Sequence, residues 1–363
     1  MKLLSLRAQN FRNLTNLELD FNKPVNTFVG NNAQGKTNIL EAITLLAFGK
    51  SLRSNSEKSL REIGTDFFRV EGLGEKSNEK KVRIEIAADV NQKTFKLNRK
   101  PIIASQLVGN FPVVSFAPEN LNLLLLSPSL RRRYLDILLS QTSRKYLLAL
   151  SSYSKALKNR NALLARIAEN LAKEEELEFW DEELAKHGSL IGKLRAEFLE
   201  FAEQPLAENF QKIANEAEEL RMQIANFHGE EISERKYLEN LGKLREKDLR
   251  YANTNYGIHR ADLIFRLENE PLAENGSRGE IRSTILALKF VELAFIEEQL
   301  KEKPVLLLDD VFSELDAARQ KSLMSLIHNH QTFITTTKIA HLDLIEKKDV
   351  WEVKNGSVEK ILR

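Results

Sequence analysis

A glycine-rich segment near the N-terminus has the residue types and spacing of a phosphate-binding loop. Residues 30–37 read G-N-N-A-Q-G-K-T, which fits the pattern G-x-x-x-x-G-K-T. Glycine lets backbone N–H groups close on phosphate oxygens, the lysine reaches the β and γ phosphates, and the threonine hydroxyl binds Mg2+. We therefore expect Lys36 to act in catalysis and Thr37 to bind the metal. The expected nucleotide contacts are Gly30, Asn31, Asn32, Ala33, Gln34, Gly35, Lys36, Thr37, Asn38 and, as a neighbour, Arg12.

A pair of carboxylates at the end of an apolar run is the second candidate. Residues 305–308 read V-L-L-L and lead directly to Asp309 and Asp310. Such a strand can simply meet solvent at its acidic end, but beside a phosphate loop each acid has a use. We expect Asp309 to hold Mg2+ and Asp310 to be the catalytic base that polarises the attacking water.

The third candidate is the segment Ser277-Arg278-Gly279-Glu280, at the expected start of a long helix. A serine followed three residues later by a glutamate is also an ordinary capping box, which serves only the helix itself. The alternative is a turn that binds phosphate. The residue types leave both interpretations open.

The elements that must position these residues change character along the chain. Alternating apolar and polar residues to about residue 116 predict antiparallel strands, and helical spacing follows the loop until Gly49. The next stretch, rich in Leu, Ala, Glu, Lys and Arg, predicts an all-helical insertion, after which strands return. We predict an α/β fold with a head formed by residues 1–120 and 251–363 and a helical arm formed by residues 121–250. The later strands are expected at 264–267, 305–308, 333–335 and 350–353, with a helix over 281–300.

Composition excludes several classes of site. The chain has 363 residues and no cysteine, so disulfides, a thiolate nucleophile and a cysteine-ligated zinc site are excluded. Its six histidines include no pair at helical spacing, which argues against a dedicated metal site. Mg2+ brought with a nucleotide is the expected metal. Neither a signal-peptide core nor an apolar run of membrane-spanning length is evident, so we expect a cytoplasmic protein without a membrane partner.

Charge is unevenly distributed within a near-neutral whole. Residues 128–167 hold nine basic side chains against one acid, and residues 169–183 hold eight acids against one lysine. The basic block could be a solvated helix face, could pair with the acidic block, or could contact the phosphates of duplex DNA. On the last interpretation the DNA contacts are Arg131, Arg132, Arg133, Arg144, Lys145, Lys155, Lys158 and Arg160.

The order of these motifs resembles that of ABC-type ATPases, and segments along the whole chain resemble the RecF family of recombination mediators, from the SMC-like branch. The segments that carry the likeness to RecF are Asn10–Asn13, Gly30–Asn38, Gly49–Ser54, Phe116–Leu121, Ser127–Asp136, Gly257–Leu263 and Leu308–Asp316. The fold that this resemblance implies is an ABC-type ATPase head, with mixed sheets around the phosphate-loop core.

The resemblance implies an ATP-dependent homodimer in which Ser277, Gly279 and Glu280 of one copy reach the ATP of the other. It places Ser313 and Asp316 at the dimer seam and Thr337 at the switch position, and we expect His341 on a helix surface. It also implies double-stranded or gapped DNA as ligand, RecR and RecO as partners, and assistance to RecA loading. His259 and Arg260 would lie at the nucleotide or the partner subunit, or would pack as a loop pair.

The chain departs from the family pattern at a few positions. Ile258 and Ala261 stand where Pro and Asp are usual, the signature is closer to SMC-like sequences, and Asp310 replaces the Glu of fast ABC ATPases. The shorter acid predicts slow hydrolysis that serves as a timer. The alternatives are a short-armed SMC-like tether, the head of a DNA-processing nuclease and, least favoured, a transporter ATPase.

Overall fold

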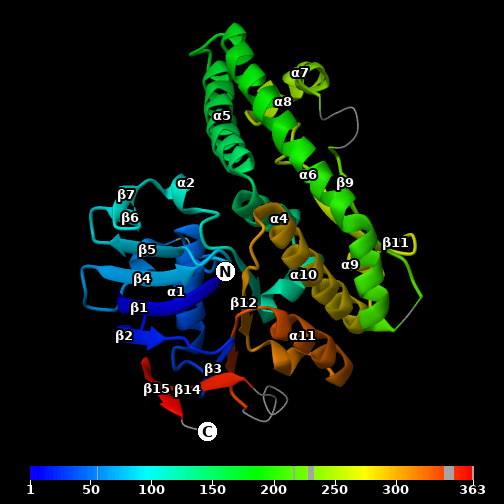
Figure 1. Cartoon of the computed structure of the whole chain (residues 1–363). Helices are drawn as coiled ribbons and strands as arrows, with labels where there is room; N and C mark the ends of the chain where they lie inside the picture. The colour runs from blue at the N-terminus through cyan, green and yellow to red at the C-terminus, as the bar shows by residue number, and fades with distance from the viewer. Residues whose placement is uncertain (55, 216, 228–232, 339–346, 362–363) are drawn as a thin grey trace. The chain divides into compact units, whose positions relative to one another are not determined.

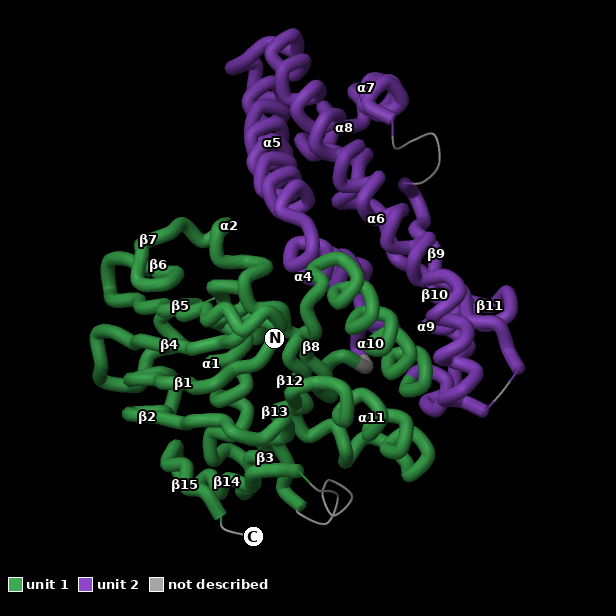
Figure 2. The backbone as a smooth tube through the Cα atoms, viewed as in Figure 1, with its two compact units in different colours: residues 1–121, 282–363 green, residues 122–281 purple. Residues whose placement is uncertain are grey.

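The computed structural model describes residues 1–54, 56–215, 217–227, 233–338 and 347–361, and it divides into two compact units (Figures 1 and 2). The first unit comprises residues 1–121 and 282–363, and the second comprises residues 122–281. The expected head therefore differs from the first unit at one boundary. Residues 251–281 belong with the helical segment, because a strand within them pairs with a strand from that segment.

The first unit contains a sheet of six antiparallel strands. Its strand order is β2-β1-β4-β5-β6-β7. Buried and exposed positions alternate along β5, as expected for strands with one face on a core. Residues 76–80 form the turn that joins β4 to β5. The strands are β1 (Lys2–Phe11), β2 (Leu14–Asp20), β4 (Phe68–Glu75), β5 (Lys81–Ala88), β6 (Lys93–Leu97) and β7 (Lys100–Ile102).

The second sheet of this unit is mainly parallel, in the order β15-β14-β3-β13-β12-β8. Only the β14–β15 pair is antiparallel. All residues of β3 and β13 are buried, including the polar Asn26, Thr27, Thr332, Thr335 and Thr336, as expected for parallel strands covered on both faces. The carboxyl ends of β3, β12 and β13 meet at one edge, where ligands bind in open α/β sheets. The strands are β3 (Val25–Val29), β8 (Val113–Phe116), β12 (Val305–Asp309), β13 (Thr332–Thr336), β14 (Lys348–Lys354) and β15 (Ser357–Ile361).

Helix α1 (Lys36–Phe48) lies between the two sheets and contacts strands of both, which is why it is buried on nearly all sides. Gly49 ends it with a left-handed φ of 68°, which glycine adopts without steric cost. The other helical elements of this unit are η1 (Glu57–Leu60), α2 (Ala104–Leu107), η2 (Pro118–Leu121), η5 (Val311–Glu314), α11 (Ala317–Asn329) and, from residue 282 on, α10 (Arg278–Leu300).

The second unit is built on two long helices, α5 (Arg144–Ala168) and α6 (Leu177–Ala214), which pack along each other (Figure 1). It also holds a three-stranded sheet, so the prediction of an all-helical insertion was wrong. In that sheet β10 (Asp262–Leu267) pairs with β9 (Leu220–Ala225) and β11 (Glu270–Pro271). The remaining elements are α3 (Asn122–Leu125), α4 (Pro128–Thr142), η3 (Glu174–Glu176), α7 (Glu234–Lys243), α8 (Arg245–Tyr251) and α9 (Leu272–Asn275). No helix within the described ranges combines the length and apolarity needed to cross a membrane.

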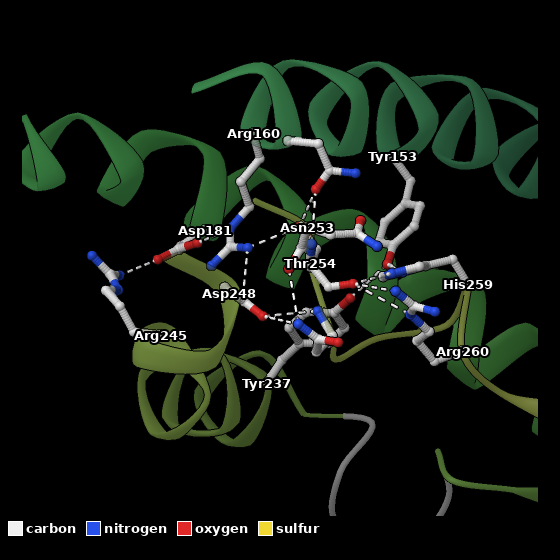
Figure 3. Close-up of polar contacts among 12 residues, drawn as sticks. Tyr153, Arg160, Asp181, Tyr237, Arg245, Asp248, Asn253, Thr254, His259 and Arg260 are labelled. Carbon is white, nitrogen blue, oxygen red and sulfur yellow. Dashed lines mark hydrogen bonds and ion pairs between the residues drawn. The ribbon is translucent and has the colours of Figure 1, made fainter. Parts of the chain in front are cut away.

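A buried ionic network joins the helices of the second unit (Figure 3). The Arg160 side chain, fully buried on α5, donates from Nε to Asp181 at 2.6 Å. From Nη1 it donates to Asp248 at 2.7 Å and to Thr254 Oγ1 at 2.8 Å. One guanidinium thus pairs with carboxylates from α6 and α8. Asp181 has a second partner in Arg245, whereas Arg160 is the ion-pair partner of the fully buried Asp248.

Replacement of Arg160 should destabilise the second unit strongly. We expect Arg160→Met to lower the free energy of unfolding by about 3 to 5 kcal/mol, because Asp181 and Asp248 lose a buried counter-charge. Urea denaturation followed by circular dichroism measures this value. The matched control is Lys158→Met on the exposed face of the same helix, which should change stability by less than about 0.5 kcal/mol. Equal effects of the two substitutions would contradict a structural role for Arg160.

Candidate functional site

The predicted phosphate loop lies between the carboxyl end of β3 and the first turn of α1, which is the strand, loop and helix context that the motif requires. Gly35 precedes the helix with a φ of 110°, a conformation that side chains other than glycine rarely adopt. The buried Lys36 ammonium donates to the carbonyl oxygens of Gly30 and Asn31, at 2.8 and 2.9 Å. The lysine therefore lies folded into its own loop, while Asn31, Asn32 and Ala33 are exposed.

The expected metal ligands lie together. The Thr37 hydroxyl donates to Asp309 Oδ1 at 2.9 Å, although the two residues are far apart in sequence. The Thr335 hydroxyl, on neighbouring β13, donates to the same oxygen at 2.6 Å. Hydroxyl and carboxylate oxygens are the hard donors that Mg2+ prefers, so this pair fits the ion chemically.

Asp310 follows directly, with a φ of 49° that turns its backbone away from the strand. Its N–H donates to Thr335 Oγ1 at 3.0 Å, and its carboxylate accepts the backbone N–H of Thr337. Burial and the nearby charge of Asp309 raise the pKa of the Asp310 carboxyl above its usual value, although Lys36 and the Thr337 N–H oppose the shift. A carboxylate with a raised pKa is a stronger base, as a residue that accepts a proton from water requires.

Arg12 and Asn38, two expected nucleotide contacts, already have protein partners. Arg12 forms a two-pronged ion pair with the buried Glu41 of α1, at 2.9 and 2.8 Å. The Asn38 side chain donates to Asn13 Oδ1 at 2.8 Å. These bonds hold the β1–β2 turn against α1, and a nucleotide contact by either side chain stays a prediction.

The turn after the acidic strand has local structural bonds. The Ser313 hydroxyl donates to the Asp310 carbonyl at 2.7 Å, and Asp316 caps α11 by accepting the Arg319 N–H at 2.9 Å. Thr337 is exposed beside Asp310, which is consistent with a switch position. His341, expected on a helix surface, lies outside the described residues.

Ser277 and Glu280 form the reciprocal capping box that their spacing allowed. The Ser277 N–H donates to Glu280 Oε2 at 3.0 Å, and the Glu280 N–H donates to Ser277 Oγ at 3.2 Å. Both residues and Gly279 belong to the second unit, at the start of α10. The structure establishes the capping role, while the contact with a second copy stays a prediction.

The expected DNA contacts separate into two groups. The prediction for Arg160 was wrong, because its side chain is buried and paired with Asp181 of the acidic block. Arg131 was wrong for a similar reason, since its guanidinium forms a two-pronged pair with Asp262 at 2.8 Å. Arg132 is partly buried and donates to the Ala261 carbonyl at 2.9 Å. The exposed members are Arg133, Arg144, Lys145, Lys155 and Lys158.

His259 and Arg260 pack as a loop pair within the second unit (Figure 3). His259 Nδ1 accepts the Tyr153 hydroxyl at 2.6 Å, and both His259 Nε2 and the Arg260 guanidinium donate to the Thr254 carbonyl. Burial lowers the pKa of the His259 imidazole to about 4, so this side chain is neutral at pH 7. His259 is thus held within its unit while Arg260 is exposed, and a contact of either residue with nucleotide or a partner subunit stays a prediction.

Sequence reasoning missed several residues that shape the site. Thr335 completes the bonds to Asp309, and Asn13, Asn355 and Gly356 contact the phosphate loop. The dipeptide Asn355-Gly356, between two segments that mix apolar and polar residues as half-buried strands do, is a strong hairpin signal that could have been read from the sequence. The contact between that hairpin and the loop was not readable, because the two are far apart in the chain.

Comparisons with known proteins cover almost the whole chain. The model described as the RecF/RecN/SMC N terminal domain matches residues 2–356. The DNA replication and repair protein RecF of Clostridioides difficile strain 630 is 37% identical over 382 residues, with 99% of each chain covered. The corresponding protein of Caldanaerobacter subterraneus subsp. tengcongensis is 37% identical over 343 residues, which cover 93% of this chain and 94% of the relative.

Solved structures agree. The recombination mediator protein RecF with ATP, in the RecFOR pathway, has a TM-score of 0.92 and 35% identity, covering 99% of this chain and 98% of that chain. An Smc head domain from Pyrococcus furiosus has a TM-score of 0.58 at 17% identity, which shows a shared fold. The first unit is thus an ABC and SMC-like α/β ATPase head, as the motif order predicted. With its phosphate loop, acidic strand and helix cap in the expected order, the chain belongs to the RecF family.

Proposed function

We propose that this chain is an ATP-dependent DNA-binding protein of replication and recombinational repair, located in the cytoplasm, and that it hydrolyses ATP slowly. The observation that carries the proposal is the convergence of Thr37, Thr335 and Asp309 beside Lys36 and Asp310, at the carboxyl ends of the parallel strands. Relatives named for DNA replication and repair, and the likeness to RecF with ATP, support it.

The residues of the site fit hydrolysis of ATP with Mg2+. The ion would be held by Thr37 and Asp309, with phosphate and water oxygens completing its shell. Lys36 would leave the loop carbonyls for the β and γ phosphates, and Asp310 would accept a proton as water attacks the γ phosphorus. The bond from phosphorus to the bridging oxygen then breaks, which yields ADP and phosphate.

A homodimer would complete the site. Ser277, Gly279 and Glu280 lie at a helix N-terminus, where backbone N–H groups and the helix dipole favour an anion. In the dimer Ser277 and Gly279 would bind the γ phosphate held by the other copy, while Glu280 would keep their turn in place. Ser313 and Asp316 would lie at the seam. ATP binding would then close the dimer, and hydrolysis would open it.

The exposed basic residues of the second unit are the proposed contacts with double-stranded or gapped DNA. Arg144, Lys145, Lys155 and Lys158 lie on α5, a helix that contains no acid, and Arg133 lies on α4. Such residues neutralise phosphates without reading base sequence. Closure of the dimer would clamp the DNA. RecO and RecR are the proposed partners, in keeping with the RecFOR pathway named for a similar structure. Assistance to RecA loading is proposed from the family resemblance alone.

Replacement of Asp310 should separate ATP binding from hydrolysis. We expect Asp310→Asn to slow hydrolysis by about 10²- to 10⁴-fold, because the amide cannot accept the proton from water. Phosphate release measures the rate. Light scattering should show that ATP holds this variant as a dimer and that adding Ser277→Arg abolishes the dimer. A dimer that persists with Ser277→Arg contradicts the contact in trans, and unchanged hydrolysis contradicts the base.

Hydrolysis should depend on pH through Asp310. The base acts only when ionised, and its raised pKa moves the loss of activity to a higher pH than an ordinary aspartate would show. We therefore expect kcat/KM for ATP, which reports the pKa values of the nucleotide-free protein, to fall as the pH is lowered. The residual hydrolysis of Asp310→Asn provides the control and should lack this dependence. A flat profile for the unmodified protein would remove Asp310 from the proton-transfer step.

Loss of the exposed lysines should weaken DNA binding and its salt dependence. We expect the triple variant Lys145→Gln, Lys155→Gln, Lys158→Gln to reduce the slope of log affinity against log salt by about 2 to 3, since each lysine releases about one counterion. The control removes the same charge from α6, with Lys186, Lys193 and Lys212 replaced by Gln. Fluorescence anisotropy with a gapped duplex measures both. Equal losses in the two variants would show that net charge, and not this face, matters.

A further inference from the structure

The turn between β14 and β15 contacts the phosphate loop directly. Its central residues, Asn355 and Gly356, have φ values of 49° and 81°, which is the two-residue type I′ geometry that Asn-Gly favours. The Asn355 N–H donates to Gln34 Oε1 at 2.7 Å, and the Gly356 N–H donates to the Gln34 carbonyl at 2.9 Å. Both bonds therefore end on one residue of the loop.

The turn between β1 and β2 supports the loop from a second direction. The Asn13 side chain donates from Nδ2 to the same Gln34 carbonyl at 3.0 Å and accepts from Asn38 at 2.8 Å. A Cβ added to Gly35 would lie only 2.6 Å from the side-chain oxygen of Asn13, so the Asn13 amide fills the space beside this glycine. The loop backbone is thus bonded to Asn13 on one side and to Gly356 on the other.

Two glycines allow this packing. A Cβ on Gly30 would lie 2.4 Å from the Val353 carbonyl oxygen on β14, and a Cβ on Gly356 would lie 1.9 Å from the Asn13 carbonyl oxygen. Both distances are far below van der Waals contact, so a side chain at either position would separate the backbone segments. The glycine of the turn is therefore as constrained sterically as the first glycine of the loop.

We infer that the β14–β15 turn, together with Asn13, is a positioning element that presets the phosphate loop for nucleotide. The inference rests on the proposed binding of ATP by this loop. If the backbone N–H groups of such a loop do not already point at the phosphates before the ligand binds, the free-energy cost of ordering them lowers the affinity. Gln34 lies between the exposed residues 31–33 and the helix, and fixing its carbonyl and side chain fixes the orientation of the neighbouring peptides.

This role predicts a specific kinetic signature. The loop backbone surrounds phosphates that ATP and ADP share. Displacement of the turn should therefore weaken both nucleotides by a similar factor, raise KM for ATP, and leave kcat at saturating ATP nearly unchanged. A residue that served only the stability of the fold would lower the melting temperature without this separation of KM from kcat.

The test compares Gly356→Ala with Gly64→Ala. Both glycines have left-handed φ values, 81° and 88°, but at Gly64 no atom of the described residues lies within 4 Å of the Cβ position. The two variants thus carry similar backbone strain, and only Gly356→Ala displaces Asn13 and the loop. We expect Gly356→Ala to weaken ATP and ADP by about 10-fold and Gly64→Ala by less than about 2-fold. Titration with a fluorescent nucleotide measures the affinities, and thermal melting without nucleotide measures stability.

A milder variant covers the case in which Gly356→Ala fails to fold. Gln34→Ala keeps the bonds from Asn13 and Gly356 to the backbone carbonyl of residue 34 and removes only the bond from Asn355 to the side chain. We therefore expect about a 3-fold loss of affinity for both nucleotides with an unchanged melting temperature. Equal affinities in Gln34→Ala and the unmodified protein, or equal losses in Gly356→Ala and Gly64→Ala, would overturn the inference. Failure of the unmodified protein to bind ATP would instead overturn the proposed function.

Discussion

The geometry of the candidate site depends on the hydrogen bonds that the Asp309 carboxylate accepts. This carboxylate accepts hydroxyl hydrogens from Thr37 and Thr335, which come from the helix after β3 and from the end of β13. Since β12 and β13 are neighbours in a parallel sheet, their carboxyl ends bring these groups to one edge without long side chains. The two hydroxyls also satisfy the acid within the protein, so the site has a defined geometry before a cation or nucleotide enters.

Much of this head could be predicted because its signals are local. The buried strand β12 is a run of four apolar residues before Asp309, and a phosphate loop has fixed spacing. Gly49 ends its helix by a backbone conformation that few other residues adopt. The site residues of the loop and the acidic strand follow from the same rules. The domain boundary could not be predicted from such local rules. The β9–β10 pairing links segments separated by about 40 residues, and nothing local marks the partner of either strand.

The basic block shows a different limit of sequence-based prediction. The helical spacing that separates its buried from its exposed residues was present in the sequence, but the block was interpreted only by its composition. Arg160 lies four residues after Ala156 and seven after Tyr153, so it falls on the face of α5 that carries the buried Tyr146, Ala149, Tyr153, Ala156 and Leu164. A helical projection would have separated it from Lys155 and Lys158. What no projection could supply is its partner, since Asp181 and Asp248 belong to other helices.

The capping box at Ser277 is compatible with the proposed binding of phosphate at the same turn. The Ser277 oxygen accepts the Glu280 N–H, and this leaves the hydroxyl hydrogen of the same serine able to donate to an anion. The cap fixes the position of the serine relative to the helix axis, and the N-terminus of α10 adds its partial positive charge. Glu280 adds a negative charge beside the same turn, which opposes a phosphate unless its bond to the Ser277 N–H is kept and its charge stays turned toward the helix. A cap that holds its acid in place would therefore be a condition for the proposed phosphate binding, so the same bonds that begin the helix would also prepare Ser277 for an anion.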